Sequence, residues 1–338
     1  MKAAVLKSLG EPLQVETVPD PSPEAAELVV KVSYCGICGT DLHSTREGPF
    51  AAECDSILGH EFCGHVAEVG SGLKDQWEIG DRVTALPFIG CGVCVSCVTG
   101  RPFECAQVQL TGMNSPGGFA EYVKTGASET LKLPDDLAMQ SAALIEPLAV
   151  GLHAVRIAQL KAGERVLIIG GGPVGLAVSL WCQFFGARDV LVSEMAEQRL
   201  ALATQLGATG TLTPGATLGE EFGDVSGGAP DVIFECVGAP GLLQETIEIA
   251  PRRSRIVPVG VCEQPDTIVP VLALVKELRL YFAIAYNRDD FETVIAMLGQ
   301  HRIDASAMIT DVVKLDEMPA AFEALRSPTT QCKVLTEL

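Results

Sequence analysis

The segment from Val166 to Ala187, "VLIIGGGPVGLAVSLWCQFFGA", constrains the fold more than any other part of this chain. An apolar run is followed by three consecutive glycines and Pro173, and then by a second apolar run. Its length and lack of charge would also suit a transmembrane helix, but glycine and proline near its start would break such a helix. A buried strand, a glycine turn and a buried helix explain the same residues without a membrane.

The glycines of this segment form a motif. Gly170, Gly172 and Gly175 match G-x-G-x-x-G directly after the strand, and the next predicted strand, "DVLVSE", ends in Glu194, nineteen residues past Gly175. The Rossmann pattern has an acidic residue there, which bonds a ribose 2′-hydroxyl. A glycine turn required only by packing is the alternative, but the order of strand, turn, helix, strand and acid favours dinucleotide binding. Because Glu194 would repel a 2′-phosphate, the expected cofactor is NAD(H).

The order of predicted elements divides the chain. From residue 1 to about 134, short strand-like runs separated by turn residues predict a largely β region. From about 148 to about 280, the strands "RVLIIG", "DVLVSE", "DVIFECVG" and "SRIVPVG" alternate with helical stretches, which predicts an α/β fold with a doubly wound parallel sheet. Two more helices and a closing strand, "CKVLTEL", follow, and we expect this last part to fold back onto the first region.

The segment "CGVCVSCVTGRPFEC" holds Cys91, Cys94, Cys97 and Cys105 with the spacing C-x2-C-x2-C-x7-C. The start of the chain has no secretory pattern, so we expect a reducing cytoplasm, where clustered thiols bind metal more often than they form disulfides. An iron–sulfur run has a shorter last gap followed by proline. Tetrahedral zinc fits better, and four thiolates would complete its coordination, so this site is predicted to be structural. An iron–sulfur cluster and redox thiols are the alternatives.

A second cluster lies in "CGICGTDLH" and "LGHEF". Cys38, His60 and Glu61 offer a thiolate, an imidazole and a carboxylate, a mixed set that suits a catalytic zinc with an open position, although the spacing alone is not decisive.

The net charge of the chain limits which macromolecules it can bind. The chain has 24 basic and 43 acidic residues, a net charge of −19, and no Lys/Arg cluster. This balance argues against nucleic acid and against an anionic membrane as partners.

Together these motifs resemble the zinc-dependent medium-chain dehydrogenase/reductase family over essentially the whole chain. The matching segments, in the family's order, are "YCGICGTDLH", "LGHEF", "GDRV", the four-cysteine segment, "GGFAEYV", "AALIEPLAVGLHA" and "GGGPVG". The resemblance implies a split, largely β GroES-like catalytic domain formed by residues 1–147 and 286–338, with a zinc lobe at 91–105, and a Rossmann domain at 148–285. It also implies reversible oxidation of an alcohol to a carbonyl compound.

The segment "ALIEPLAVGLHA" is most similar to the sorbitol, threonine and butanediol dehydrogenase branch, in which Glu146 replaces a cysteine ligand of liver-type alcohol dehydrogenases. The resemblance implies that Cys38 and His60 bind the catalytic zinc, with Glu61 and Glu146 sharing the remaining positions with water or substrate. It assigns Asp41 to orienting His60, and Thr40 and His43 to a proton relay. The candidate cofactor-binding residues are Gly170, Gly172, Pro173, Val174, Gly175, Glu194, Arg199, Cys236, Val259, Gly260 and Val261.

The expected activity is NAD-dependent, zinc-dependent oxidation of a secondary alcohol or diol to a ketone, by a homotetramer or homodimer that holds two zinc ions per chain. By resemblance the substrate pocket is walled by "STREGPF", "ALPFIG" and "LYFAIAYN". These segments offer Leu86, Phe88, Tyr281, Phe282 and a single cation, Arg46. Polyol dehydrogenases of this branch tend to carry an Arg-Tyr pair where this chain has Tyr286-Asn287, which disfavours sorbitol as the substrate.

Three alternatives stay open. One is a polyol dehydrogenase of the sorbitol type. A second is a catalytically silent scaffold that keeps NAD and zinc. A third is a zinc-free reductase of the same superfamily that acts on quinones or enones, although such enzymes lack the ligand set and the four-cysteine lobe.

Overall fold

The computed structural model describes residues 1–73, 75–327 and 330–338. This part of the chain divides into two compact units. The first comprises Met1–Glu146, Asn287–Arg302 and Ile309–Leu338, and the second comprises Pro147–Tyr286 and Ile303–Met308.

One short segment departs from the expected division. The expected catalytic domain comprised 1–147 and 286–338, whereas Ile303–Met308, and at the two boundaries Pro147 and Tyr286, group with the second unit. The physical reason is local: the 3₁₀ helix η2 (Ser306–Met308) contacts helix α6 (Glu197–Gln205).

The first unit is mostly β structure, as the turn-rich pattern predicts. Its strands are β1 (Lys2–Leu6), β2 (Gln14–Thr17), β3 (Glu27–Gly36), β4 (Ser56–Ile57), β5 (Glu61–Val69), β6 (Arg82–Ala85), β7 (Phe88–Ile89), β8 (Gln109–Leu110), β9 (Tyr122–Gly126), β10 (Thr130–Lys132), β17 (Ile309–Lys314) and β18 (Lys333–Glu337). They form a three-stranded sheet ordered β2-β1-β4, a seven-stranded sheet ordered β10-β6-β5-β3-β18-β17 with β9 also pairing β3, and the β7-β8 ribbon. Its helical segments are α1 (Gly39–Ser44), α2 (Val95–Val98), η1 (Pro102–Glu104), α3 (Met139–Ala142), α10 (Arg288–Gly299) and α11 (Met318–Ala324).

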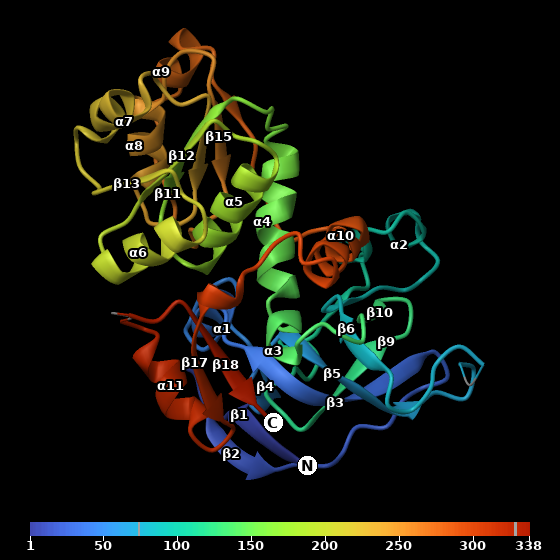
Figure 1. The fold of residues 1–338 in the computed structure, drawn as a ribbon. Helices are drawn as coiled ribbons and strands as arrows, with labels where there is room; N and C mark the ends of the chain where they lie inside the picture. The colour runs from blue at the N-terminus through green and yellow to red at the C-terminus, as the bar shows by residue number, and fades with distance from the viewer. Residues whose placement is uncertain (74, 328–329) are drawn as a thin grey trace. The chain divides into compact units, whose positions relative to one another are not determined.

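Strand β18 joins the two ends of the chain in one sheet. It lies beside β3 (Figure 1) and pairs antiparallel with it. In this register Thr336 lies opposite Cys35. Between the sheets lies a core that includes Phe62, Phe119 and Phe322, the last from α11. Burying such a side chain stabilises the fold by about 1.5–3 kcal/mol. The expected return of the C-terminal segment onto the first region is therefore present, and it brings α11 and β18 against the N-terminal strands.

The second unit is an α/β layer structure. Its strands are β11 (Arg165–Ile169), β12 (Asp189–Ser193), β13 (Gly210–Leu212), β14 (Val232–Glu235), β15 (Arg255–Pro258) and β16 (Arg279–Leu280), all parallel and ordered β13-β12-β11-β14-β15-β16 (Figure 1). Its helices are α4 (Ile145–Ile157, which begins at the end of the first unit), α5 (Pro173–Phe184), α6, α7 (Leu218–Ser226), α8 (Leu242–Ile249), α9 (Pro270–Val275) and η2. This strand order, 3-2-1-4-5-6, is that of the Rossmann fold.

Both faces of the central strand β11 are covered, which explains the four consecutive buried apolar residues that follow Arg165. Leu167 packs in a cluster with Phe222 of α7 and Ile247 of α8. Ile168 points to the opposite face, toward Gly175 of α5. Within the described residues no helix combines the length and the apolar character that crossing a membrane requires, and α5 is accounted for as a buried helix.

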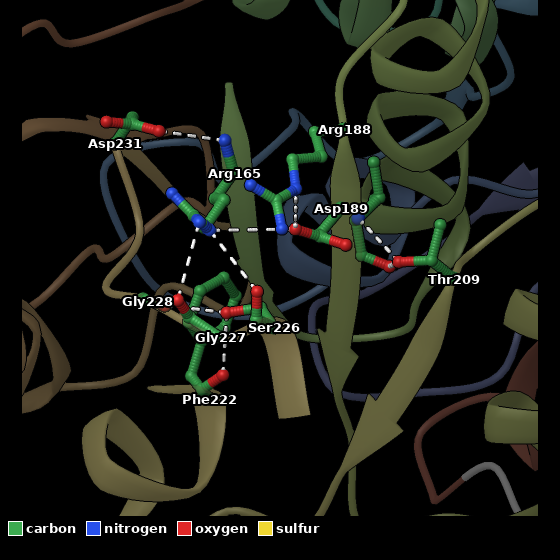
Figure 2. Close-up of polar contacts among 10 residues, drawn as sticks. Arg165, Arg188, Asp189, Thr209, Phe222, Ser226, Gly227, Gly228 and Asp231 are labelled. Carbon is green, nitrogen blue, oxygen red and sulfur yellow. Dashed lines mark hydrogen bonds and ion pairs between the residues drawn. The ribbon is translucent and has the colours of Figure 1, made fainter. Parts of the chain in front are cut away.

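The amino edge of the parallel sheet is closed by polar contacts around Arg165 (Figure 2). The Arg165 amide donates to Asp231 Oδ2 at 2.9 Å, and its guanidinium donates to the carbonyls of Ser226 and Gly227 at 3.3 and 3.4 Å, where α7 ends. Asp189 Oδ2 lies 3.6 Å from the same guanidinium. In open parallel sheets ligands bind at the opposite edge, at the carboxyl ends of the strands, where the glycine turn of this unit lies.

Candidate functional site

Asp41 ties together the two segments that carry the mixed ligand set. Its side chain is buried, and its two oxygens accept hydrogen bonds from the amide of Cys38 at 2.9 Å and the amide of Gly59 at 3.1 Å. His60 Nδ1 lies 3.4 Å from Asp41 Oδ1. Since Nδ1 faces this carboxylate, the other ring nitrogen is left to bind a ligand. The relation between Asp41 and His60 is the one that the resemblance implies.

Cys38, His60 and Glu61 converge. One ligand atom from each lies within 4.8 Å of the others. Cys38 immediately precedes α1, and Glu61 is the first residue of β5. Burial opposes a charge on His60, but Asp41 and Cys38 together outweigh it and raise the pKa of His60 well above its ordinary value. A site whose negative groups hold a proton this firmly also attracts a cation, and a thiolate, an imidazole and a carboxylate suit zinc.

Lys333 of β18 is a functional candidate that the sequence analysis missed. Its Nζ lies 2.6 Å from both carboxylate oxygens of Glu61 and donates to the carbonyl of Ile37 at 3.0 Å. Burial opposes its charge, but Glu61, with Cys38 and Glu146 adding to the effect, raises the pKa of Lys333. The closing strand also contains Thr336 and Glu337, so a lysine at its start did not stand out in the sequence.

The remaining catalytic candidates lie on two helices. Thr40 and His43 are half-buried and three positions apart on α1, a spacing that puts them on one face of that helix. Glu146 is in the first turn of α4 and is 9 % exposed. It is not among the three residues whose ligand atoms lie within 4.8 Å.

The four-cysteine lobe forms a compact cluster. The sulfur atoms of Cys91, Cys94, Cys97 and Cys105 lie within 4.8 Å of one another. Backbone N–H groups of Val93 and Cys94, and the thiol of Cys105, lower the pKa of Cys91 to about 6. Amide donors directed at sulfur favour the thiolate, which is the form that binds metal. These four donors therefore fit a tetrahedral zinc with no open position.

The glycine turn of the second unit has the geometry that the motif predicts. Gly170 has φ +102°, a conformation that favours glycine, and a Cβ at Gly175 would lie 1.9 Å from the carbonyl oxygen of Gly170. Glu194, at the end of β12, accepts hydrogen bonds from the amides of Gly171 at 2.9 Å and Met195 at 2.7 Å. Arg199 Nη1 lies 3.7 Å from the same carboxylate. The acid and the turn are thus joined directly.

A second loop lies at the carboxyl ends of β14 and β15, in the region of the candidates Cys236 and 259–261. Glu235, which is buried, accepts hydrogen bonds from the amides of Val237 at 2.6 Å and Gly238 at 2.8 Å. A Cβ at Gly260 would lie 2.2 Å from the nitrogen of Gly238. Burial, with the Glu235 carboxylate adding to it, raises the pKa of Cys236 well above its ordinary value, so this thiol stays protonated. The sequence analysis did not single out Glu235, which holds this loop.

The expected substrate-pocket residues differ in exposure. Leu86 is buried, Phe88 and Tyr281 are half-buried, Phe282 is 69 % exposed and Arg46 is exposed. Tyr286 is buried, and Asn287 precedes α10, where its amide donates to Asp290 Oδ2 at 2.8 Å. The pair Tyr286-Asn287 is therefore integrated into the fold at the start of that helix.

Comparison with known proteins agrees with this geometry. Residues 24–135 match the alcohol dehydrogenase GroES-like domain, and residues 173–300 match the zinc-binding dehydrogenase domain. Sorbitol dehydrogenase of Bacillus subtilis is 34 % identical, over 98 % of this chain and 95 % of that protein. (R,R)-butanediol dehydrogenase of Bacillus subtilis is 32 % identical, over 96 % of each chain.

Solved structures agree along the whole chain. A crystal structure of an alcohol dehydrogenase from E. coli CFT073 in complex with NADH superposes with a TM-score of 0.91 at 29 % identity, covering 100 % of this chain and 99 % of the other. A zinc-binding dehydrogenase of Sinorhizobium meliloti 1021 bound to NADP gives 0.89 at 32 % identity, with the same coverage. With its GroES-like and Rossmann-type parts and its two clusters of candidate zinc ligands, the chain belongs to the zinc-dependent medium-chain alcohol dehydrogenase family.

Proposed function

We propose that this enzyme oxidises neutral secondary alcohols, cyclic alcohols and vicinal diols included, to ketones, reversibly and with NAD as the acceptor. The observation that carries the proposal is the convergence of Cys38, His60 and Glu61 within 4.8 Å, backed by the buried Asp41. Three donors leave a tetrahedral ion one position for substrate, whereas the four thiols of the lobe leave none. The proposal therefore includes two zinc ions per chain, one catalytic and one structural.

When bound, zinc supplies a Lewis acid that makes a substrate hydroxyl acidic near neutral pH, and NAD accepts the hydride. The chain's own residues do the rest. Cys38 and His60 would hold the metal, and Asp41 fixes the orientation of the His60 ring. Glu61 is shared with Lys333, and Glu146 is the second carboxylate candidate. In this proposal, Thr40 and His43 pass the substrate proton along one face of α1 to solvent.

Glu194 supports NAD over NADP. Its carboxylate lies beside the glycine turn and accepts hydrogen bonds from backbone amides there. A carboxylate has about four acceptor sites, so it can also accept bonds from ribose hydroxyls, while its charge opposes a 2′-phosphate. Arg199 would favour a phosphate, but it lies 3.7 Å from Glu194, which compensates its charge.

The substrate class is inferred from what the expected pocket segments lack. They supply apolar side chains and one exposed cation, Arg46, so a strongly anionic substrate has little to pair with. A site that rejects analogues strongly must bond their hydroxyl groups, whereas an apolar pocket separates methylenes by only about 1–3 kcal/mol each. We therefore infer broader tolerance than that of a sugar-specific enzyme.

Two other functions remain as outcomes of the test. A polyol dehydrogenase is favoured by the similarity to sorbitol dehydrogenase, and it is disfavoured by Tyr286-Asn287, because the buried tyrosine and the helix-initiating asparagine replace an Arg-Tyr pair. A catalytically silent scaffold is disfavoured by the intact ligand set and by the relay candidates.

The proposal includes self-association as a homotetramer, with a homodimer as the alternative, in the reducing cytoplasm that clustered free thiols suit. Strand β16 lies at one edge of the parallel sheet. Near it in sequence, Val271, Leu274, Phe282 and Ile284 are 56 %, 73 %, 69 % and 60 % exposed. A second copy of the chain is a partner that would cover them. Sedimentation velocity would give the number of chains.

The test is a substrate scan that follows NADH absorbance, with elemental analysis of the same preparation. We expect two zinc ions per chain, and kcat/KM highest for a cyclic secondary alcohol or 2,3-butanediol, with sorbitol and a primary alcohol lower. Sorbitol or a primary alcohol ranking first would overturn the substrate class. Zinc-loaded protein that oxidises none of them would support the scaffold instead.

A further inference from the structure

Helix α1 carries the proposed proton relay, yet it has little stability of its own. It spans six residues, Gly39–Ser44, between the ligand candidate Cys38 and Thr45. Isolated helices this short are unstable in water, so α1 depends on contacts with the rest of the unit. Its amino end is held by Asp41, as described above. What holds its carboxyl end therefore determines where His43 lies.

The carboxyl end of α1 is bonded by a side chain from the far end of the sequence. Arg326, just past α11, donates from Nη1 to the carbonyl of Leu42 at 3.3 Å and from Nη2 to Thr45 Oγ1 at 2.8 Å. Thr45 Oγ1, which is buried, donates in turn to the same Leu42 carbonyl at 3.0 Å. A cation is also the favourable charge at a helix carboxyl end. The last turn of α1 is thus fixed by a guanidinium.

Arg326 is itself held in one orientation. Glu323 accepts from its Nε at 2.7 Å and from Nη2 at 3.0 Å, a bidentate pair, and the guanidinium carbon lies 5.5 Å from the centroid of the Phe322 ring. Phe322 is fully buried, and the Arg326 side chain is 16 % exposed. The bidentate carboxylate and the aromatic ring together fix the orientation of the planar guanidinium group. The ammonium group of a lysine could not make both contacts in this geometry.

We propose that Arg326 is a positioning residue for alcohol oxidation, which fixes α1 and thereby the relay candidates Thr40 and His43. This inference rests on the proposed function. The printed contacts of Arg326 are with Leu42, Thr45, Phe322 and Glu323, none of them a candidate zinc ligand, so it acts on the proton-transfer step through the helix. Loss of Arg326 slows proton departure, which raised pH or an added buffer base then restores in part, because solvent takes over the task of the misplaced histidine.

The experiment compares zinc-loaded wild type with Arg326→Ala, Arg326→Lys and Glu323→Gln. We expect Arg326→Ala to lower kcat by about tenfold or more while KM changes little, since a charge-assisted hydrogen bond is removed. Glu323→Gln and Arg326→Lys should fall between it and wild type, and they keep the test usable if Arg326→Ala fails to fold. Hydrogen exchange of the amides in residues 38–46 provides a readout independent of activity, and it should be faster in Arg326→Ala.

Arg255 provides the matched control. In the second unit its guanidinium donates to the carbonyls of Ala158 and Gln159 after the end of α4, at 2.7 and 2.8 Å, and pairs with Glu164 at 2.5 Å. Arg255→Ala removes the same chemistry from a different helix, so it should lower stability without the pH-dependent loss of kcat and without faster exchange in residues 38–46.

The outcomes separate the two claims. Unchanged exchange in Arg326→Ala, an unchanged kcat, or a loss of kcat that neither pH nor buffer base restores would overturn the positioning role. A wild type that oxidises no alcohol would refute the proposed function and the relay with it, whereas unchanged exchange beside an active wild type would refute only the role of Arg326.

Discussion

Lys333 Nζ lies 2.6 Å from both carboxylate oxygens of Glu61, and the two side chains are 2 % and 0 % exposed. Glu61 also belongs to the cluster with Cys38 and His60. One carboxylate is therefore shared between a buried lysine and the candidate metal site. Gly36 makes room for it, because a Cβ there would lie 2.1 Å from Glu61 Oε2. Charge compensation of Glu61 by Lys333 is thus built into the fold of the first unit.

Removing one partner of this pair should destabilise the protein. Lys333→Met leaves a buried carboxylate uncompensated, which costs about 3–5 kcal/mol of unfolding free energy. Urea unfolding measures the loss of unfolding free energy. This loss should be smaller with zinc bound, because the zinc ion compensates the charge of Glu61, and larger after a chelator has removed the metal. The double variant Lys333→Met/Glu61→Gln should recover much of the loss. Additive losses in that variant would argue against the coupling.

The lobe and the mixed cluster should respond differently to the loss of one thiol. Cys97→Ser breaks a closed four-thiol site, and we expect lower thermal stability or failed assembly as its first effect. Cys38→Ser should abolish turnover and leave the fold, as measured by circular dichroism. Elemental analysis should fall from two zinc ions to one in each variant. Full activity in wild-type protein that contains one zinc or none would contradict both assignments.

Glu129 makes stability depend on pH. Burial raises its pKa, although Ser128 Oγ donates to its carboxylate at 2.6 Å. The folded state therefore keeps a proton that the unfolded state releases near its ordinary pKa of about 4.5, so stability falls as pH rises above that value. Relative to Glu129→Gln, which cannot ionise, the wild type should lose unfolding free energy as pH rises above about 4.5. A constant difference between the two proteins would rule this out.

The parts of the fold that could be predicted from the sequence are those that depend on residues close together in the chain. The parallel sheet follows from strands whose two faces are both buried, such as β11, and the cofactor turn follows from Gly170 and Gly175, where the backbone itself leaves no room for a side chain. The four-cysteine cluster also followed from its spacing within one short segment, whereas the cluster of Cys38, His60 and Glu61 was predicted only through the family resemblance.

The contacts that support the site were not predictable in this way. Lys333 and Glu61 are 272 residues apart, and Arg326 and Leu42 are 284 apart. Nothing in the neighbourhood of either cation signals a partner, since a lysine in a strand and an arginine after a helix are most often solvated surface residues. Their pairing exists only once β18 has joined β3, and that step depends on the packing of the whole unit.

If Thr40 and His43 form a proton relay, substituting each of them should lower kcat for alcohol oxidation to a different extent. Thr40→Val removes the hydroxyl nearest the reacting oxygen in the proposed relay, and we expect kcat to fall by about 10²–10⁴-fold. His43→Gln removes the last donor before solvent, which water can replace, so its loss should be smaller and should diminish at high pH or with added base. Steady-state alcohol oxidation across a range of pH provides the measurement. Undiminished turnover by Thr40→Val would exclude the relay.

Glu194 should determine the choice of cofactor. We expect the wild type to prefer NAD, and Glu194→Ser to raise kcat/KM for NADP while lowering it for NAD, because the substitution removes both the ribose acceptor and the charge that repels a 2′-phosphate. The carboxylate also accepts hydrogen bonds from the amides of Gly171, Met195 and Ala196, so the serine variant loosens the turn as well.

Glu194→Gln separates the effect of charge from that of the lost hydrogen bonds, because glutamine keeps an acceptor of the same shape without the charge. If repulsion dominates, glutamine should gain NADP activity almost as serine does, by about tenfold for each 1.4 kcal/mol of repulsion removed. If the gain appears only with serine, the size of the side chain and not its charge excludes the phosphate. Initial rates with both cofactors decide between these outcomes, and a wild type that prefers NADP would refute the assignment of Glu194.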